Sequence, residues 1–171
     1  MSYFKVLGFD KEPFSTSPDP DFFYLSREHE TALTNVLIEL RLKRGLSVIL
    51  GDVGTGKTTL SRKLIQELKE RDDCIFNIIL DPTFEDEKLF LTSLVRNFEI
   101  NVDAASSSIN GSASASGGGT TILALRESLE RFLFQKGVTE GKTVILIIDE
   151  AQKLTENSLE ILRLLLNYET N

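Results

Sequence analysis

The sequence has little of the side-chain chemistry on which many enzymes and metal proteins depend. Its 171 residues include one cysteine (Cys74), one histidine (His29) and no tryptophan. A single cysteine excludes an intrachain disulfide, and so few cysteines and histidines exclude a metal centre built from them. The apolar neighbours of Cys74 predict a buried, unreactive thiol. We expect His29 to be a surface or helix-capping residue.

Long apolar runs and excess positive charge are also missing. No apolar run approaches the roughly 20 residues that span a bilayer, and the N-terminus lacks the pattern of a signal peptide, so we expect a cytoplasmic protein. Lysine and arginine total 19 against 26 acidic residues, which gives a net charge of −7. This balance argues against a broad nucleic-acid surface, although a local basic patch stays open. The length fits one domain, residues 1–171.

One stretch carries glycine, lysine and threonine at the spacing of a phosphate-binding loop. Residues 51–58 read GDVGTGKT, which fits the P-loop pattern G-x-x-x-x-G-K-[ST]. The apolar run Leu46–Leu50 before it predicts a strand, and residues 59–68 after it predict a helix with one apolar face. This context predicts a nucleotide-binding site made of Gly51, Asp52, Val53, Gly54, Thr55, Gly56, Lys57, Thr58 and Thr59.

These residue types suit a bound triphosphate. Glycines without a Cβ let the backbone approach an oxyanion closely, and the following helix adds the positive end of its dipole. Lys57 would place its charge on the β- and γ-phosphates. The hydroxyl of Thr58 is a hard oxygen ligand, which suits Mg²⁺. We therefore expect a nucleoside triphosphate and Mg²⁺ at this loop.

A second motif supplies two adjacent carboxylates. The apolar run Val144–Ile148 is followed by Asp149 and Glu150, as in a Walker B strand. Ligands of open α/β sheets bind at the carboxyl ends of strands, so both side chains would lie at that edge. We expect Asp149 to hold the Mg²⁺ shell. We expect Glu150 to orient or deprotonate the attacking water, so that Glu150 and Lys57 are the candidate catalytic residues.

The remaining pattern alternates strands with helices, which predicts an α/β fold with a parallel sheet flanked by helices. A buried strand is expected at residues 74–80, and the last strand at 144–148. Helices are expected from Ser26 to about Arg44, where Gly45 would stop the first, and at residues 86–97, 122–135 and 154–168. Gly137 and Gly141 would bracket a turn.

Two segments do not follow this alternation. Residues 1–25 are rich in aromatics and prolines, which predicts an irregular arm that either covers the nucleotide base or closes the core. Residues 104–121 contain almost only Ser, Ala, Gly and Thr, which predicts a flexible loop within the domain. The loop could be a natural insertion, an engineered linker or, as a weaker alternative, a serine-rich substrate site.

The sequence resembles the ExeA-type ATPases, the general secretion pathway protein A family, over nearly all of the chain outside residues 104–121. The resemblance lies in Tyr3–Phe14, Pro18–Ser26, His29, Gly51–Thr59, Ile147–Gln152 and Leu162–Thr170. It implies an AAA+ module that binds and hydrolyses ATP with Mg²⁺, assembles into homo-oligomers and supports a bacterial secretion or pilus apparatus. It also implies a place at the cytoplasmic face of the inner membrane, with a secretion or peptidoglycan-linked partner.

Other functions stay open beside this one. The transposition ATPases of the MuB and TniB type are similar in motif and bind DNA, which the acidic charge makes less favourable here. Small-molecule kinases share the P-loop, but no acceptor pocket is evident. The family's sensor-1 strand and C-terminal lid would follow residue 171, so we expect this chain to lack them and to bind nucleotide with slow hydrolysis. Arg126, Arg131 or Arg163 could serve a neighbouring subunit.

Overall fold

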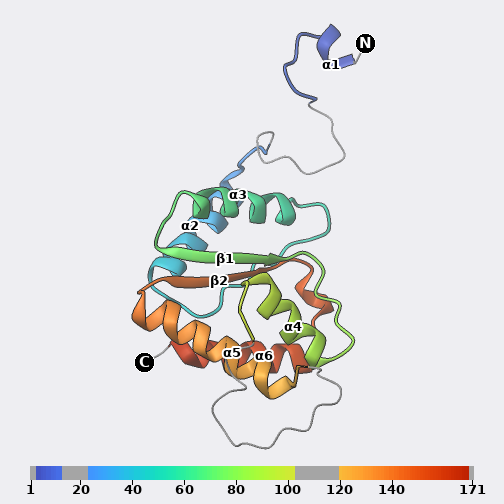
Figure 1. Cartoon of the computed structure of the whole chain (residues 1–171). Coiled ribbons are helices and arrows are strands. Elements are labelled where there is room, and N and C mark those ends of the chain that lie inside the picture. Colours follow the sequence, from blue (N-terminus) through green and yellow to red (C-terminus); the bar gives the residue numbers. More distant parts are fainter. Residues whose placement is uncertain (1–2, 13–22, 103–119, 170–171) are drawn as a thin grey trace, which may run out of the picture. The chain divides into compact units, whose positions relative to one another are not determined.

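The computed structural model describes residues 3–12, 23–102 and 120–169, which form two compact units, residues 1–71 and 72–171 (Figure 1). No helix among the described residues is long and apolar enough to cross a membrane.

The first unit begins with a single helical turn. Helix α1, Tyr3–Val6, lies within the segment that we expected to be wholly irregular. Its chain turns at Gly8, whose φ of 78° lies in the left-handed region that favours glycine. Residues 13–22, which carry three of the four prolines, lie outside the described residues.

Helix α2, Arg27–Arg41, begins where the sequence predicted and ends early. The side chain of Ser26 accepts a hydrogen bond from the backbone N–H of His29, as expected of an N-cap. At the other end Lys43 adopts φ 50°, and the N–H groups of Lys43 and Arg44 donate to the carbonyls of Leu40 and Glu39. This Schellman arrangement ends the helix before Gly45, the residue we expected to stop it.

The predicted strand Leu46–Leu50 is the main error in the first unit. These residues form no strand, and Leu46, Val48 and Leu50 are exposed by 72%, 69% and 88%. A strand is stable when the backbone of a neighbour satisfies its N–H and C=O groups, and no described strand pairs with this run. The apolar composition predicted a strand, but no described strand forms the pairing on which a strand depends.

Helix α3, Lys57–Lys69, follows the glycine-rich loop as predicted. It buries Leu60, Leu64 and Leu68, which recur every four residues and therefore form one stripe. Leu68 is fully buried, with 0% of its surface exposed. Burial of this stripe holds the helix in place. It therefore also fixes the helix N-terminus, which the glycine-rich loop directly precedes.

The second unit contains a two-stranded parallel sheet. Strands β1, Cys74–Ile79, and β2, Thr143–Ile148, pair in register from Cys74 opposite Thr143 to Ile79 opposite Ile148. Both strands were predicted within one residue of these bounds. Cys74 is half-buried, so the expectation of a fully buried thiol was wrong. The parallel pairing brings both strand ends to one edge of the sheet.

Three helices cover one face of this sheet (Figure 1). They are α4, Glu87–Asn97, α5, Ile122–Phe134, and α6, Glu156–Leu166, capped at their N-termini by Asp86, Thr121 and Thr155. Their apolar stripes meet the sheet in one core: Ile79, Phe90, Leu91, Leu94, Val95, Leu125, Leu129 and Ile161. The predicted α/β layering is therefore present in this unit, with two strands.

Two of these helices continue into different helical forms. Helix α5 leads into a π-helical turn, η2, Gln135–Thr139, which includes Gly137, so the predicted turn is confined to the residues near Gly141. Helix α6 is preceded by the 3₁₀ turn η3, Ala151–Lys153, and followed by η4, Asn167–Glu169. Residues 103–119, most of the predicted flexible loop, lie outside the described residues, whereas Thr121 caps α5.

Candidate functional site

The loop at residues 51–58 has the backbone conformation that its glycines predicted. Gly54 and Gly56 adopt φ 81° and 87°, in the left-handed region. A Cβ added to Gly51 would lie 3.0 Å from Thr55 Oγ1. The Thr55 hydroxyl in turn donates to the Asp52 carbonyl at 2.8 Å, which closes the loop on itself. The result is a tight turn directly before the N-terminus of α3, where oriented N–H groups attract anions.

Lys57 reaches back over this turn. Its Nζ donates to the carbonyls of Gly51 and Asp52 at 2.8 and 2.7 Å, so two of the three N–H donors of an ammonium group are held by the loop itself. A phosphate bound in the turn would lie next to this positive charge. Thr58 and Thr59 follow in the first turn of α3 and are half-buried, while Val53 at the tip is fully exposed.

The structure adds two residues to this loop that sequence reasoning did not assign to it. His29 Nε2 lies 2.8 Å from the Thr55 carbonyl oxygen, and the Phe23 ring packs edge-on against the His29 ring with centroids 4.8 Å apart. His29 is therefore half-buried against the loop rather than on the surface, while its contacts with the N-cap Ser26 agree with the expected place at the helix cap. The signals in the sequence were the place of Phe23 in the aromatic segment 1–25 and that of His29 among the residues that carry the family resemblance.

The two predicted carboxylates lie together at the end of β2, in the second unit. Asp149 continues the ladder, because its N–H donates to the Ile79 carbonyl at 2.8 Å, and its Oδ1 accepts the N–H of Glu150 at 3.0 Å. Glu150 has φ 51°, which is uncommon for a residue with a side chain. Its carboxylate accepts the amide N–H of Gln152 at 2.6 Å, which limits where that carboxylate can point.

A third carboxylate stands at the same edge. Asp81 follows β1, and its Oδ1 accepts the Thr83 hydroxyl at 2.6 Å and Lys153 Nζ at 3.3 Å. The Thr83 hydrogen bond first, and then Lys153, lower the pKa of Asp81 below its usual 3.8. The sequence marked Asp81 only as the end of a strand. The parallel register shows that it belongs to the edge that carries Asp149 and Glu150.

Two of the candidate arginines are engaged within the second unit. Arg126 pairs with Glu87 at 2.6 Å, between α5 and α4, and Arg163 pairs with Glu160 at 2.6 Å on α6. The Glu160 contact raises the pKa of Arg163. Arg131 is exposed on α5. Either pair would have to open before its guanidinium could reach a neighbouring subunit.

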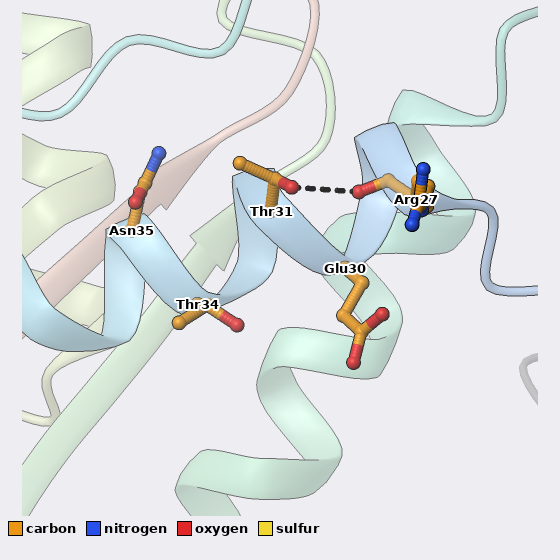
Figure 2. Close-up of a pocket in the computed structure, with 5 residues that line it drawn as sticks. All are labelled: Arg27, Glu30, Thr31, Thr34 and Asn35. Atoms are coloured by element: carbon orange, nitrogen blue, oxygen red, sulfur yellow. Dashed lines mark hydrogen bonds between the residues drawn. The ribbon is translucent and has the colours of Figure 1, made fainter.

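A shallow hollow in the first unit does not coincide with the glycine-rich loop. Figure 2 shows its lining, Arg27, Glu30, Thr31, Thr34 and Asn35, which all come from α2. The Thr31 hydroxyl donates to the Arg27 carbonyl at 2.7 Å, so the one bond drawn there is internal to the helix. Side chains from a single helix enclose little, and we assign no ligand to this surface.

A glycine turn with two left-handed residues, a lysine folded over it and a helix behind it have the geometry expected of a phosphate-binding loop. The chain matches the AAA domain family over residues 40–171 and belongs to that family of P-loop, nucleotide-binding modules. This assignment agrees with the α/β layering of the second unit.

One curated relative is similar in sequence to this chain over almost all of its length. The general secretion pathway protein A of Aeromonas hydrophila is 32% identical over 169 residues, which is 99% of this chain and 28% of that protein. The chain thus spans about 28% of the length of its relative. No solved structure matches the chain significantly. The resemblance to the ExeA type that the sequence motifs indicated is confirmed.

Proposed function

We propose that this chain is an ATP-binding AAA+ module that hydrolyses ATP slowly with Mg²⁺. The observation that carries the proposal is the loop at residues 51–58, where left-handed Gly54 and Gly56 form the turn and Lys57 places its charge over it. Such a turn at a helix N-terminus matches the size and charge of a phosphate group. Catalysis would rest on positioning and charge neutralisation rather than on a covalent nucleophile.

The donor set fits a magnesium ion carried by the nucleotide. Among the described residues no group of three His, Cys, Asp or Glu side chains could hold a metal ion. Mg²⁺ usually keeps several waters and uses one or two protein oxygens plus substrate phosphates. The Thr58 hydroxyl and the Asp149 carboxylate are hard oxygen ligands of that kind. When bound, Mg²⁺ would neutralise charge on the phosphates.

Glu150 is the proposed water-activating residue. Its carboxylate is held by the Gln152 amide at 2.6 Å, and the unusual backbone at φ 51° fixes the direction in which the side chain leaves the strand end. A general base has to be held within hydrogen-bond reach of the water that it orients. A strained residue beside a strand end is a common feature of functional sites, which supports this role.

Nucleotide binding tests the loop. We expect Lys57→Ala to weaken Mg·ATP binding by about tenfold or more, because a charge-assisted contact to phosphate is lost. Isothermal titration calorimetry measures the dissociation constant. Lys69→Ala, which removes the same charge from the far end of α3, serves as the control and should bind like the wild type. Equal affinity in Lys57→Ala and the wild type would show that the loop is not the phosphate site.

Hydrolysis tests the carboxylate. We expect Glu150→Gln to bind Mg·ATP normally and to lower the phosphate-release rate by about 10²-fold, because general-base assistance contributes about that much. Measuring both the affinity for Mg·ATP and the hydrolysis rate separates a catalytic defect from a folding defect. A Glu150→Gln variant that hydrolyses at the wild-type rate would remove Glu150 from the mechanism.

For the cellular role, we propose that the module serves assembly of a bacterial secretion or pilus apparatus at the cytoplasmic face of the inner membrane, as part of a homo-oligomer. The support is the named relative and the net charge of −7, which disfavours DNA. A gel-shift titration with double-stranded DNA, with and without ATP, tests the alternative. Salt-sensitive, ATP-dependent binding would favour the transposition type of ATPase instead.

A further inference from the structure

The hydrogen bond between His29 and the P-loop determines which ring nitrogen carries a proton. A carbonyl oxygen can only accept, so the 2.8 Å contact to the Thr55 carbonyl requires that His29 Nε2 donates. The other ring nitrogen, Nδ1, lies 2.9 Å from Ser26 Oγ. The Ser26 hydroxyl also donates to Glu28 Oε2 at 2.8 Å, so the contact that fixes the ring is the bond from Nε2 to the P-loop backbone, with the helix cap beside Nδ1.

This contact also orients the next N–H group of the loop. The Thr55–Gly56 peptide is planar, and there is no cis peptide among the described residues. In a trans peptide the C=O and the following N–H point in opposite directions. With the Thr55 carbonyl turned toward His29, the Gly56 N–H faces the opposite side of the loop.

The same peptide is enclosed by the Phe23 ring. A Cβ at Gly56 would lie 3.2 Å from Phe23 Cε2 and 3.5 Å from His29 Nε2, so the two rings are packed against the backbone at this point. We call Phe23 and His29 the ring clamp. Gly56 has φ 87° and immediately precedes α3, which makes its N–H one of the donors at the helix N-terminus.

We propose that His29 is a positioning residue of the nucleotide site, whose Nε2–H fixes the Thr55–Gly56 peptide so that the Gly56 N–H faces the bound phosphate. The inference rests on the proposed function of the loop. Glycine lowers the cost of rotating this peptide, and a rotated peptide would turn a carbonyl oxygen toward the phosphate instead of a donor. The ring clamp removes that freedom before the nucleotide arrives and so lowers the ordering cost of binding.

A matched pair of substitutions tests the hydrogen bond. The amide nitrogen of glutamine can occupy the place of Nε2, whereas that of asparagine reaches only the place of Nδ1. We expect His29→Asn to weaken Mg·ATP binding about fivefold, the effect of one hydrogen bond, and His29→Gln to stay within about twofold of the wild type. His29→Phe, which retains a ring beside Phe23 but no donor, should match His29→Asn.

Two further readouts separate positioning from a purely structural role. Thermal unfolding without nucleotide should give similar midpoints for His29→Asn and His29→Gln. In protein labelled with ¹⁵N-glycine, the Gly56 resonance should move on ATP binding in the wild type and in His29→Gln, and less in His29→Asn.

The outcomes are distinct. If the wild type binds ATP and His29→Asn binds equally well, the inference is wrong while the proposed function stands. If both His29→Asn and His29→Gln lose affinity together with thermal stability, the residue supports the fold and does not position the loop. If the wild type does not bind ATP, the proposed function fails and the inference fails with it.

Discussion

Two of the carboxylates that follow the strands of the second unit have different surroundings. Asp81 is tied by the Thr83 hydroxyl and Lys153, whereas Glu150 is tied by a neutral amide, that of Gln152. A cation and a hydroxyl donor both favour the ionised carboxylate. Asp81 is therefore suited to stay charged and to hold neighbouring side chains in place.

The pKa of Asp81 provides the first prediction at this scale. Thr83→Val and Lys153→Met should each raise the pKa of Asp81, because the Thr83 hydrogen bond first, and then the hydrogen bond and charge of Lys153, lower it. The ionised form stabilises the fold above the unfolded pKa near 3.8, and this contribution is lost as the pH falls through the lower native pKa.

Carboxyl ¹³C titration by NMR measures both variants against the wild type. An unchanged Asp81 pKa in both variants would contradict the prediction.

At the scale of the element, helix α4 supplies the deepest part of the core of the second unit. Phe90 and Leu91 are fully buried with 0% of their surface exposed, and Leu94 with 1%. Phe90 also meets the ring of Phe84 with centroids 5.2 Å apart. The same core cluster includes residues of β1, α5 and α6, so this helix contributes the most deeply buried side chains to a core that all four elements share.

We therefore predict that Phe90→Ala lowers the free energy of unfolding by about 3–5 kcal/mol, the usual cost of truncating a buried phenylalanine. Leu89→Ala changes the neighbouring residue, which is 47% exposed, and should cost less than about 1 kcal/mol. Urea unfolding monitored by circular dichroism measures both. Similar losses in the two variants would show that α4 is not packed as described.

At the scale of the whole molecule, the exposure of the apolar run Leu46–Leu50 is the feature least expected of a protein surface. Leu50 is 88% exposed, and no described strand pairs with the run. Unpaired, apolar extended backbone is a template for association with another chain. The chain covers 28% of its relative's length, so this exposure describes the 171-residue chain and carries no conclusion about a longer protein.

We predict that the 171-residue chain self-associates through this run and that Leu50→Lys reduces the association. A charge at the exposed position opposes pairing with a second copy. Leu123→Lys on α5 is the control, because Leu123 is 66% exposed and the change in charge is the same. Sedimentation velocity at tens of micromolar measures the association. Equal effects of the two variants, or a monomeric wild type, would contradict the prediction.

The sequence by itself determined the features that depend only on residues close to one another in the chain. The glycines of the P-loop need no tertiary contact to favour positive φ, and Lys57 and Thr58 follow from spacing alone. The cap Ser26 and the apolar stripes of α3 and α4 were likewise readable, because a helix satisfies its hydrogen bonds within one segment. Strands β1 and β2 were identified by continuous apolar runs.

Tertiary structure alone decided what depends on a partner distant in the sequence. Leu46–Leu50 has the composition of a strand, yet a strand exists only beside another strand, and no described strand pairs with this run. The same reason explains His29 and Asp81. The Thr55 carbonyl and Lys153 that define their roles are 26 and 72 residues away in sequence. Local pattern places a side chain on its own element, and folding decides which backbone group or charge it meets.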